Sequence, residues 1–217
     1  MIRTERNGLA WHSFDSFHAP AIVDAVFTRN GGTSQRPFAS LNVGGTVGDD
    51  PACVQENHRR ILEVLGVQAE QVVTAQQVHG DRIVVVSPED GGKTFIETDA
   101  LISQGPGLFL LLRFADCVPI FLYAPRQRAI GLAHAGWKGT LQRIAAKTAL
   151  AMRAAFGCDP ADLYAGLGPA IGSCCMEVDG DVLANFRAEY GQEEGCIMRP
   201  QPDGKAFLDL WRINTLQ

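Results

Sequence analysis

The sequence has 217 residues, of which 46% are hydrophobic, and its formal net charge is −5. A chain of this length buries roughly 70% of its unfolded surface, so it can hold a sizeable core and is expected to form a single domain over residues 1–217. The acidic balance argues against a nucleic-acid-binding protein, and no run of residues approaches the ~20 apolar positions of a membrane-spanning helix. The N-terminal residues lack the apolar core of a signal peptide. Six irregularly spaced cysteines are typical of reduced thiols, which predicts a cytoplasmic protein.

The first third of the chain predicts one strand, one long loop and one helix. A short strand begins at Asp24 and gives way to a loop rich in Gly, Ser, Pro and Asn that extends to Gly45; loops of this length in compact domains are usually functional. A helix is expected from Asp49 or Asp50, which caps it, to Gly66, which ends it. Its buried stripe is expected to hold Val54, His58, Ile61 and Leu65.

The rest of the chain alternates between strand and helix patterns. Strands are expected within residues 71–86, 108–125, 129–136 and 162–175, and helices within residues 140–156 and 179–191. Residues 71–86 contain two strands around Gly80-Asp81, a weaker hairpin signal than Asp-Gly. Because strands and helices interleave and at least two neighbouring strand pairs are antiparallel, the sequence predicts an α+β fold, an α/β sandwich with mixed β-sheets flanked by helices.

Three chemically versatile side chains stand at predicted strand ends. His79 ends one strand, Cys117 follows a break in the apolar run, and His134 lies near the end of the strand that is expected to pair with the one after Cys117. Two imidazoles and one thiolate suit zinc and leave a fourth position open, which is the catalytic pattern. Water in that position has a pKa of ~7. Copper takes the same ligand types, but a reduced compartment and a single cysteine favour zinc.

Two other interpretations of these residues stay open at this level. A buried cysteine is commonly a small hydrophobic residue, and a histidine in an apolar strand is commonly a satisfied core residue. Alternatively, Cys117 and His134 form a nucleophile–base dyad that needs no metal. Both functional interpretations require the two side chains to be adjacent.

Longer motifs in the chain resemble a known family. In order, the chain contains QQVHG, TDALIS, ADCVPIFLYAP, AHAGWKG and GLGPAIGSCCMEV, preceded by TRNGGTS and SLNVG. Together they resemble the YfiH/YlmD family of laccase-domain (DUF152) proteins over residues from about Phe27 to Trp211. The resemblance implies a zinc site of His79, Cys117 and His134, and a fold grouped with the cytotoxic-necrotizing-factor cysteine hydrolases.

The resemblance also implies several activities. Members are zinc-dependent purine nucleoside phosphorylases that act on adenosine, inosine and methylthioadenosine and also deaminate adenosine. Other members are copper-dependent polyphenol oxidases, and a bacterial branch is an amidase that edits a peptidoglycan precursor carrying serine in place of alanine. We therefore expect an enzyme with a small-molecule substrate and neither a nucleic-acid nor a membrane partner; its oligomeric state is open.

Candidate substrate contacts follow from what phosphorolysis requires. Arg29, Arg59 and Lys138 are candidates for phosphate, and Lys138 precedes an expected helix start at Thr140, where free N–H groups favour anions. The remaining candidates are Asn42 and Gln77 for the nucleoside, Asp99 to orient a ligand histidine or move a proton, and His58. Four of them have a stated alternative: Lys138 as a solvated lysine, Asn42 as a turn residue, Asp99 as a turn cap, and Gln77 as a residue that supports the metal site.

Two departures from the family pattern concern the site's completeness. Members often carry Arg after the Asn of the helix motif, where this chain has His58 followed by Arg59. Family chains usually continue past Asp-Leu-Trp, whereas this sequence stops at Gln217, so the catalytic domain is expected to lack the family's C-terminal strands.

The residues present allow the activities implied by the resemblance to be ranked. The base-deaminase signature is absent, because His134 is followed by Ala135 and Gly136. Five histidines cannot supply the several His-rich clusters of multicopper chemistry. The sequence thus predicts a zinc-dependent purine nucleoside phosphorylase with adenosine deaminase as a side activity. The alternatives are the amidase, then a copper-dependent polyphenol oxidoreductase, and finally a binding or scaffold protein without activity.

Overall fold

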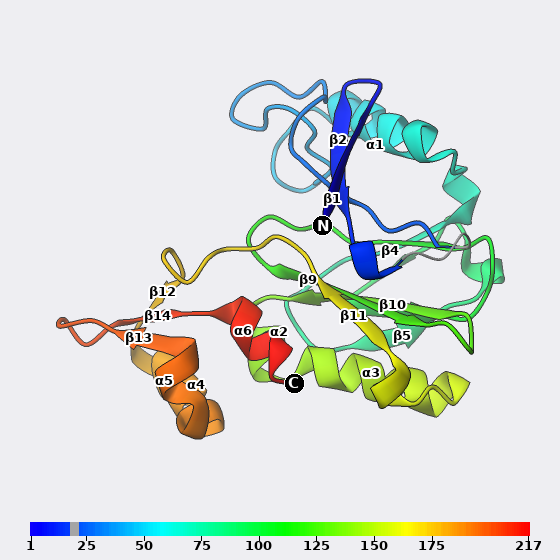
Figure 1. Ribbon diagram of the computed structural model, residues 1–217. Helices are drawn as coiled ribbons and strands as arrows, with labels where there is room; N and C mark the ends of the chain where they lie inside the picture. The colour runs from blue at the N-terminus through cyan, green and yellow to red at the C-terminus, as the bar shows by residue number, and fades with distance from the viewer. Residues whose placement is uncertain (18–21) are drawn as a thin grey trace. The chain divides into compact units, whose positions relative to one another are not determined.

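The computed structural model describes residues 1–17 and 22–217, which form two compact units, Met1–Val72 and Val73–Gln217 (Figure 1). The single catalytic domain expected over residues 1–217 stays a prediction. Within the described ranges, every helix is too short or too polar to cross a membrane.

The first unit contains a three-stranded antiparallel sheet and one long helix. Its strands are β1 (Ile2–Arg6), β2 (Leu9–Ser13) and β3 (Val26–Phe27), in the order β1-β2-β3. The strand expected near Asp24 is β3. The β1–β2 hairpin was not anticipated, although its turn is Asn7-Gly8, with both residues at positive φ, which is a strong hairpin signal.

The helix of this unit, α1 (Pro51–Leu65), begins and ends as its sequence predicts. The Asp50 side chain accepts a hydrogen bond from the Ala52 N–H at 2.9 Å, and Gly66 closes the helix with φ of 69°. Its buried residues are Val54, Asn57, Ile61 and Val64, so the predicted stripe through His58 and Leu65 is displaced by one position.

The displacement has a polar cause. Asn57 is fully buried, and its amide donates to the backbone oxygens of Ser40 and Asn42, while its oxygen accepts from the Thr33 N–H at 2.8 Å. Burial of an amide is tolerated because these partners satisfy it. Asn57 therefore fixes the Gly- and Ser-rich loop against α1, and His58 lies half-buried beside it.

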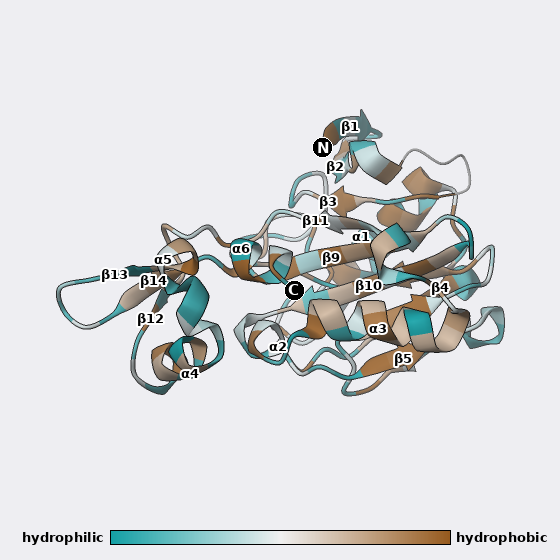
Figure 2. Ribbon diagram, turned by 60° about the horizontal axis from the view of Figure 1, so that its bottom comes forward, coloured by the Kyte–Doolittle hydropathy of each residue, from teal (hydrophilic) through white to brown (hydrophobic). Residues whose placement is uncertain are grey.

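The second unit is built on a mixed five-stranded sheet with helices, as the sequence predicted. The order is β11 (Tyr164–Leu167), β9 (Val118–Ala124), β10 (Ala129–Ala135), β7 (Ala100–Ser103) and β5 (Ile83–Val85). Neighbours are antiparallel except β5 and β7, which are parallel. Helix α3 (Ile144–Phe156) packs on β10, β7 and β5, and Figure 2 shows the hydrophobic character of the strands beside it. The strands and helix bury a core that includes Ile102, Ile120 and Met152.

Smaller elements complete this unit. Strands β6 (Thr94–Phe95), β4 (Val72–Ala75) and β8 (Phe109–Leu111) form one sheet, and β12 (Glu177–Val178), β14 (Ala206–Leu208) and β13 (Met198–Pro200) form another. The helices are α2 (Trp137–Leu141), α4 (Gly180–Tyr190), α5 (Glu194–Ile197) and α6 (Leu210–Thr215).

Two sequence predictions for this unit were wrong in detail. Residues 71–86 do not form a hairpin: β4 ends at Ala75, and β5 joins a different sheet. His79 therefore lies in a loop rather than at a strand end, with a left-handed φ of 61°. The helix expected over residues 140–156 is two helices, α2 and α3, because Arg143 between them also takes a left-handed φ of 61°.

Candidate metal centre

The end of strand β10 collects the candidate ligands. His134 lies on β10, whose antiparallel neighbours begin beside its end: Ala133 pairs with Ala100 at the start of β7, and Ala135 pairs with Val118 at the start of β9. Asp99 therefore lies beside His134 on one side. On the other side His134 pairs with Pro119, and Cys117 lies just beyond the pair of Ala135 with Val118. The strand–turn–strand that separates Cys117 from His134 brings them together, as expected from the sequence.

His79, Cys117 and His134 converge. Their three ligand atoms, one from each residue, lie within 4.8 Å of one another. The two imidazole rings meet edge to face, with centroids 4.9 Å apart and an interplanar angle of 71°. His134 is buried, Cys117 is half-buried and His79 is exposed, so the cluster opens to solvent on the His79 side.

Asp99 fixes the orientation of the His134 ring. The carboxylate is 0% exposed, and its Oδ1 lies 2.9 Å from His134 Nδ1. Although burial acts to raise the pKa of Asp99, its hydrogen bonds outweigh that effect and keep the carboxylate ionised, so it can only accept and His134 Nδ1 carries the proton. The Nε2 lone pair of His134 is then available as a metal ligand, which is the usual arrangement for a ligating histidine.

The same carboxylate holds the backbone of His79. It accepts from the N–H groups of Val78 at 3.1 Å, His79 at 3.0 Å and Gly80 at 2.9 Å. Three consecutive N–H groups converging on one anion are a known means of shaping a loop. Asp99 thereby compensates the left-handed backbone of His79, and one side chain positions both histidines.

Gly136 leaves room for the cluster. A Cβ atom added there would lie 2.9 Å from His79 Cδ2 and 3.1 Å from Cys117 Sγ. Gly139 is similarly constrained, since a Cβ would lie 3.0 Å from the backbone oxygen of Gly80. The small residues around His134 are therefore required by the approach of the His79 and Cys117 segments.

The cluster's surroundings shift three pKa values. Burial is the largest cause of the lowered pKa of His79. The charges of His134 and Lys138 lower it further, and the Asp99 carboxylate acts in the opposite direction. Burial also raises the pKa of the Cys117 thiol, and the carboxylates of Asp116 and Asp99 add to this. For Asp99, burial acts to raise the pKa, but its hydrogen bonds to His134, Gly80 and Val78 together place it below its ordinary value.

Gln77 joins the segment of His79 to the segment before Cys117. Its Nε2 donates to the backbone oxygen of Arg113 at 2.7 Å, and its Oε1 accepts from the Arg113 N–H at 2.9 Å. The Arg113 guanidinium donates to the backbone oxygen of Ala75. The amide that was a candidate nucleoside contact is thus occupied in supporting the backbone; Arg113, which the sequence did not single out, is its partner.

Lys138 is the exposed cation of this region. It is the second residue of α2, which begins at Trp137, so it lies within the helix and does not precede it as predicted. Its Nζ lies 5.4 Å from the centroid of the Trp137 ring. Its charge helps to lower the pKa of His79, which places it within electrostatic reach of the cluster.

The other candidate contacts lie on the first unit, and their roles stay predictions. Arg29 donates to the backbone oxygen of Ala39, Asn42 donates to Asp49 at 2.8 Å, and His58 Nε2 lies 3.1 Å from the backbone oxygen of Val43. Arg59 makes ion pairs with Glu56 and Glu63. Hydrogen bonds from Arg59 and Arg60 hold the pKa of Glu56 at about 2.

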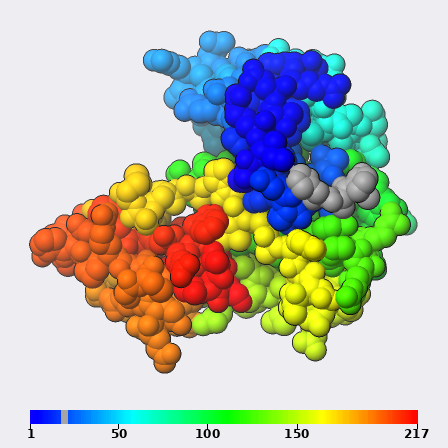
Figure 3. Space-filling model, in the orientation of Figure 1, coloured from blue at the N-terminus to red at the C-terminus, as the bar shows by residue number. Residues whose placement is uncertain are grey.

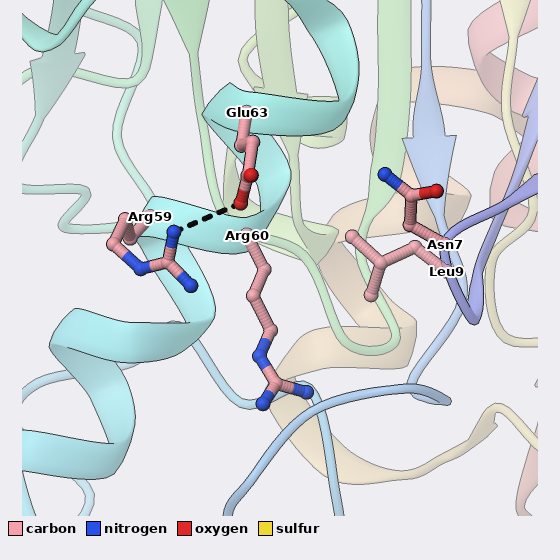
Figure 4. A pocket seen from close by; sticks show the side chains of 5 residues that line it. All are labelled: Asn7, Leu9, Arg59, Arg60 and Glu63. Atoms are coloured by element: carbon pink, nitrogen blue, oxygen red, sulfur yellow. Dashed lines mark hydrogen bonds and ion pairs between the residues drawn. The ribbon is translucent and has the colours of Figure 1, made fainter.

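A cavity of about 350 Å³ lies beside Arg59 on the first unit (Figure 4). It is lined by Asn7, Leu9, Arg59, Arg60 and Glu63. The dashed line in Figure 4 marks the 2.8 Å ion pair between Arg59 and Glu63. Because Arg60 is also paired, with Glu56, the two guanidinium groups at this cavity are already compensated.

The donor set of the cluster fits a metal ion. Two imidazole nitrogens and a thiolate are the ligand types of zinc and copper sites, and three donors leave one coordination position for a substrate or water. The Asp99–His134 pair adds the carboxylate support that ligating histidines usually have. Among the described residues, this is the one cluster of at least three such side chains able to hold an ion.

Comparisons with known proteins point to one family. The family model described as "Multi-copper polyphenol oxidoreductase laccase" matches residues 23–217. The chain is 40% identical over 209 residues to "Purine nucleoside phosphorylase YlmD" of Geobacillus stearothermophilus, covering 92% of this chain and 76% of the relative. It is 40% identical to a purine nucleoside phosphorylase of Deinococcus radiodurans, over 89% of this chain and 73% of that protein.

A solved structure agrees with these relatives. The crystal structure of YlmD from Geobacillus stearothermophilus matches with a TM-score of 0.91 and 38% identity, covering 99% of this chain and 81% of that one. The fold and the resemblance inferred from the motifs are thereby confirmed. The family and the His-Cys-His cluster together indicate a metal.

Gly136→Ala is expected to weaken metal binding at least about 10-fold, because the added methyl group displaces His79 and Cys117, and small displacements of this kind are costly in a packed site. Competition with a chromophoric chelator measures the affinity. Gly195→Ala is the matched control, since a Cβ there meets no atom within 4 Å. Equal affinities for Gly136→Ala and the unaltered protein would contradict the geometry.

Asp99→Asn is expected to lower metal affinity by about 10- to 100-fold, the usual cost of losing a carboxylate that supports a ligand. The amide cannot accept on both sides, so either His134 or the Val78–Gly80 backbone loses its partner. Asp162→Asn, which alters an exposed carboxylate paired with Arg126, serves as control. Thermal unfolding separates lost binding from lost folding; unchanged affinity in a folded Asp99→Asn protein would refute the role.

Proposed function

This chain belongs to the laccase-domain family of the YlmD and YfiH proteins, and from that membership and its site we propose that it is a zinc-dependent purine nucleoside phosphorylase. Adenosine, inosine and methylthioadenosine are its proposed substrates, with adenosine deamination as a side activity. The observation that carries the proposal is the convergence of His79, Cys117 and His134, in a chain 40% identical to a protein named for this activity.

Zinc is the proposed metal, held by His79, Cys117 and His134. The nitrogen and sulfur donors, with one open position, are typical of catalytic zinc. When bound, it would supply a Lewis acid that polarises an oxygen atom at the cluster. The lowered pKa of His79 supports ligation, because a neutral imidazole is the form that binds metal.

The chain's own residues meet the other needs of phosphorolysis. In this reaction a phosphate oxygen bonds to the anomeric carbon of the ribose while the bond to the purine breaks. The exposed ammonium of Lys138, close to the cluster, is the proposed phosphate contact. Asp99 holds the protonated Nδ1 of His134, which keeps that ring in one orientation throughout.

The main alternative is a metal-free hydrolase in which Cys117 attacks an amide and His134 is its base. The Asp99–His134 hydrogen bond would serve this mechanism too, since hydrolytic triads also orient their histidine with a carboxylate. The raised pKa of Cys117 weighs against it, because cysteine nucleophiles work from a lowered pKa. We therefore place the amidase second.

Copper-dependent polyphenol oxidation ranks third. Although the family description names multi-copper chemistry, residues 1–17 and 22–217 contain one His-Cys-His cluster rather than several. All six cysteines are free thiols, which supports the proposed cytoplasmic location.

The activity is tested by incubating the zinc-loaded protein with adenosine and inorganic phosphate. We expect phosphate-dependent release of adenine and ribose 1-phosphate, separated by chromatography, and the same reaction without phosphate as control. Inosine as the main product would make deamination the principal activity. Absence of any phosphate-dependent product at full zinc loading would refute the proposal.

Cys117→Ala is expected to abolish stoichiometric zinc binding together with phosphorolysis, because the cluster loses its one thiolate donor. Elemental analysis gives the zinc content, and Cys196→Ala, at an exposed cysteine, is the control. Full zinc occupancy in an inactive Cys117→Ala protein would favour the nucleophile–base dyad instead.

A further inference from the structure

Two neighbouring cysteines, outside the candidate metal centre, have sulfur atoms in contact. Cys174 and Cys175 lie in residues 168–176, which join β11 to β12, and both are exposed. Their Sγ atoms are 3.3 Å apart, and one thiol donates to the other. The connecting segment, yellow to gold in Figure 3, lies at the molecular surface, so solutes reach it.

A closed turn holds the two thiols together. The N–H groups of Cys175 and Met176 both donate to the backbone oxygen of Gly172, at 2.9 and 3.2 Å. The Glu177 N–H donates back to the Cys175 oxygen at 3.0 Å. The backbone of both cysteines is therefore held in a closed turn, which keeps the two side chains close enough for their sulfurs to meet.

A bond between these sulfurs would be easily reversed. Adjacent Cα atoms are about 3.8 Å apart, below the roughly 4.4–6.8 Å that relaxed disulfides span. Strained and exposed disulfides are the labile kind, which thiols reduce readily. The pair is thus unsuited to stabilising the fold and suited to cycling between two oxidation states.

We propose that Cys174 and Cys175 form a redox-active dithiol, which a hydroperoxide oxidises to a disulfide and a low-molecular-weight thiol reduces again. One thiolate sulfur attacks a peroxide oxygen; the O–O bond breaks, water or an alcohol leaves, and a sulfenic acid forms. The second thiol then attacks the sulfenic sulfur, an S–S bond forms and water leaves. Two electrons pass from the sulfurs to the peroxide.

Either sulfur can make the first attack in this scheme, because either thiol can donate to the other. The hydrogen bond and charge of Cys174 raise the pKa of the Cys175 thiol. Whichever sulfur is oxidised first has the other beside it to complete the disulfide.

The position of the dithiol links it to the metal centre's neighbourhood. The Gly168 N–H donates to the backbone oxygen of Pro119, and the Ile171 N–H donates to that of Asp116, both at 2.9 Å. These two acceptors flank Cys117 in the chain. The test therefore uses zinc-loaded protein, in which Cys117 is a metal ligand under the proposed function. Mass spectrometry of peptides then shows which cysteines have been oxidised.

The test treats reduced, zinc-loaded protein with a small molar excess of hydrogen peroxide, followed by alkylation and peptide mass spectrometry. We expect the peptide containing residues 174 and 175 to lose two hydrogens and both alkylation sites, and reduced glutathione to restore them. Cys196, which is exposed but has no neighbouring cysteine in the sequence, should be oxidised at least about 10-fold more slowly than the pair. Cys174→Ser and Cys175→Ser should each abolish the loss of two hydrogens, whereas Cys196→Ser should retain it.

Separate oxidation of both sulfurs to sulfinic or sulfonic acids, or disulfide-linked dimers in place of the internal bond, would overturn the proposal. Persistence of the two-hydrogen loss in Cys174→Ser would also overturn it. Because the readout is a mass assigned to one peptide, it is independent of phosphorolysis. A failed nucleoside assay would therefore leave this result standing, and the reverse also holds.

Discussion

The buried carboxylate of Asp99 is the interaction on which the candidate site depends. It accepts one hydrogen bond from the His134 ring and three from consecutive backbone N–H groups around His79. Hydrogen bonds to a charged group contribute about 1.5–3 kcal/mol each, whereas burying an unpaired carboxylate costs several kcal/mol. The full set of partners is what allows a charge to remain at 0% exposure. Loss of any one of these hydrogen bonds leaves the buried carboxylate less well compensated. The positions of the two histidines are therefore coupled through Asp99.

The sheet topology delivers the three donors to one place. Because β10 lies between two antiparallel neighbours, its end meets the start of β7, which follows Asp99, and the start of β9, which follows Cys117. The strands are hydrophobic and packed under α3, so the polar groups lie where strand pairing stops. Gly136 then admits the His79 ring and the Cys117 sulfur to van der Waals contact. A rigid scaffold thus presents a half-open cluster, with His79 on the exposed side.

Two sulfur environments in the same unit have different chemistry for physical reasons. Cys117 is half-buried among carboxylates, which raises its pKa and makes a bound cation the natural way to stabilise its thiolate. Cys174 and Cys175 are exposed and face each other, so each sulfur's nearest reactive partner is the other. The first environment suits a metal ligand and the second suits reversible oxidation. Their backbones are joined through Asp116 and Ile171.

Sequence alone predicted the α+β class and the caps of α1, because apolar periodicity and capping chemistry are local signals. His79, Cys117 and His134 were candidate ligands from their residue types, the family resemblance implied them as a set, and the structure brings them together. The sequence also supported the family through motifs that the comparisons confirmed. Only the tertiary structure decided that His79 sits in a left-handed loop and not at a strand end, since the hydrogen bonds that replace the strand ladder come from Asp99, twenty positions away. The same holds for Gln77, whose amide is occupied by Arg113, thirty-six positions along the chain. Partners this distant in sequence leave no local pattern, so the folded chain had to supply them.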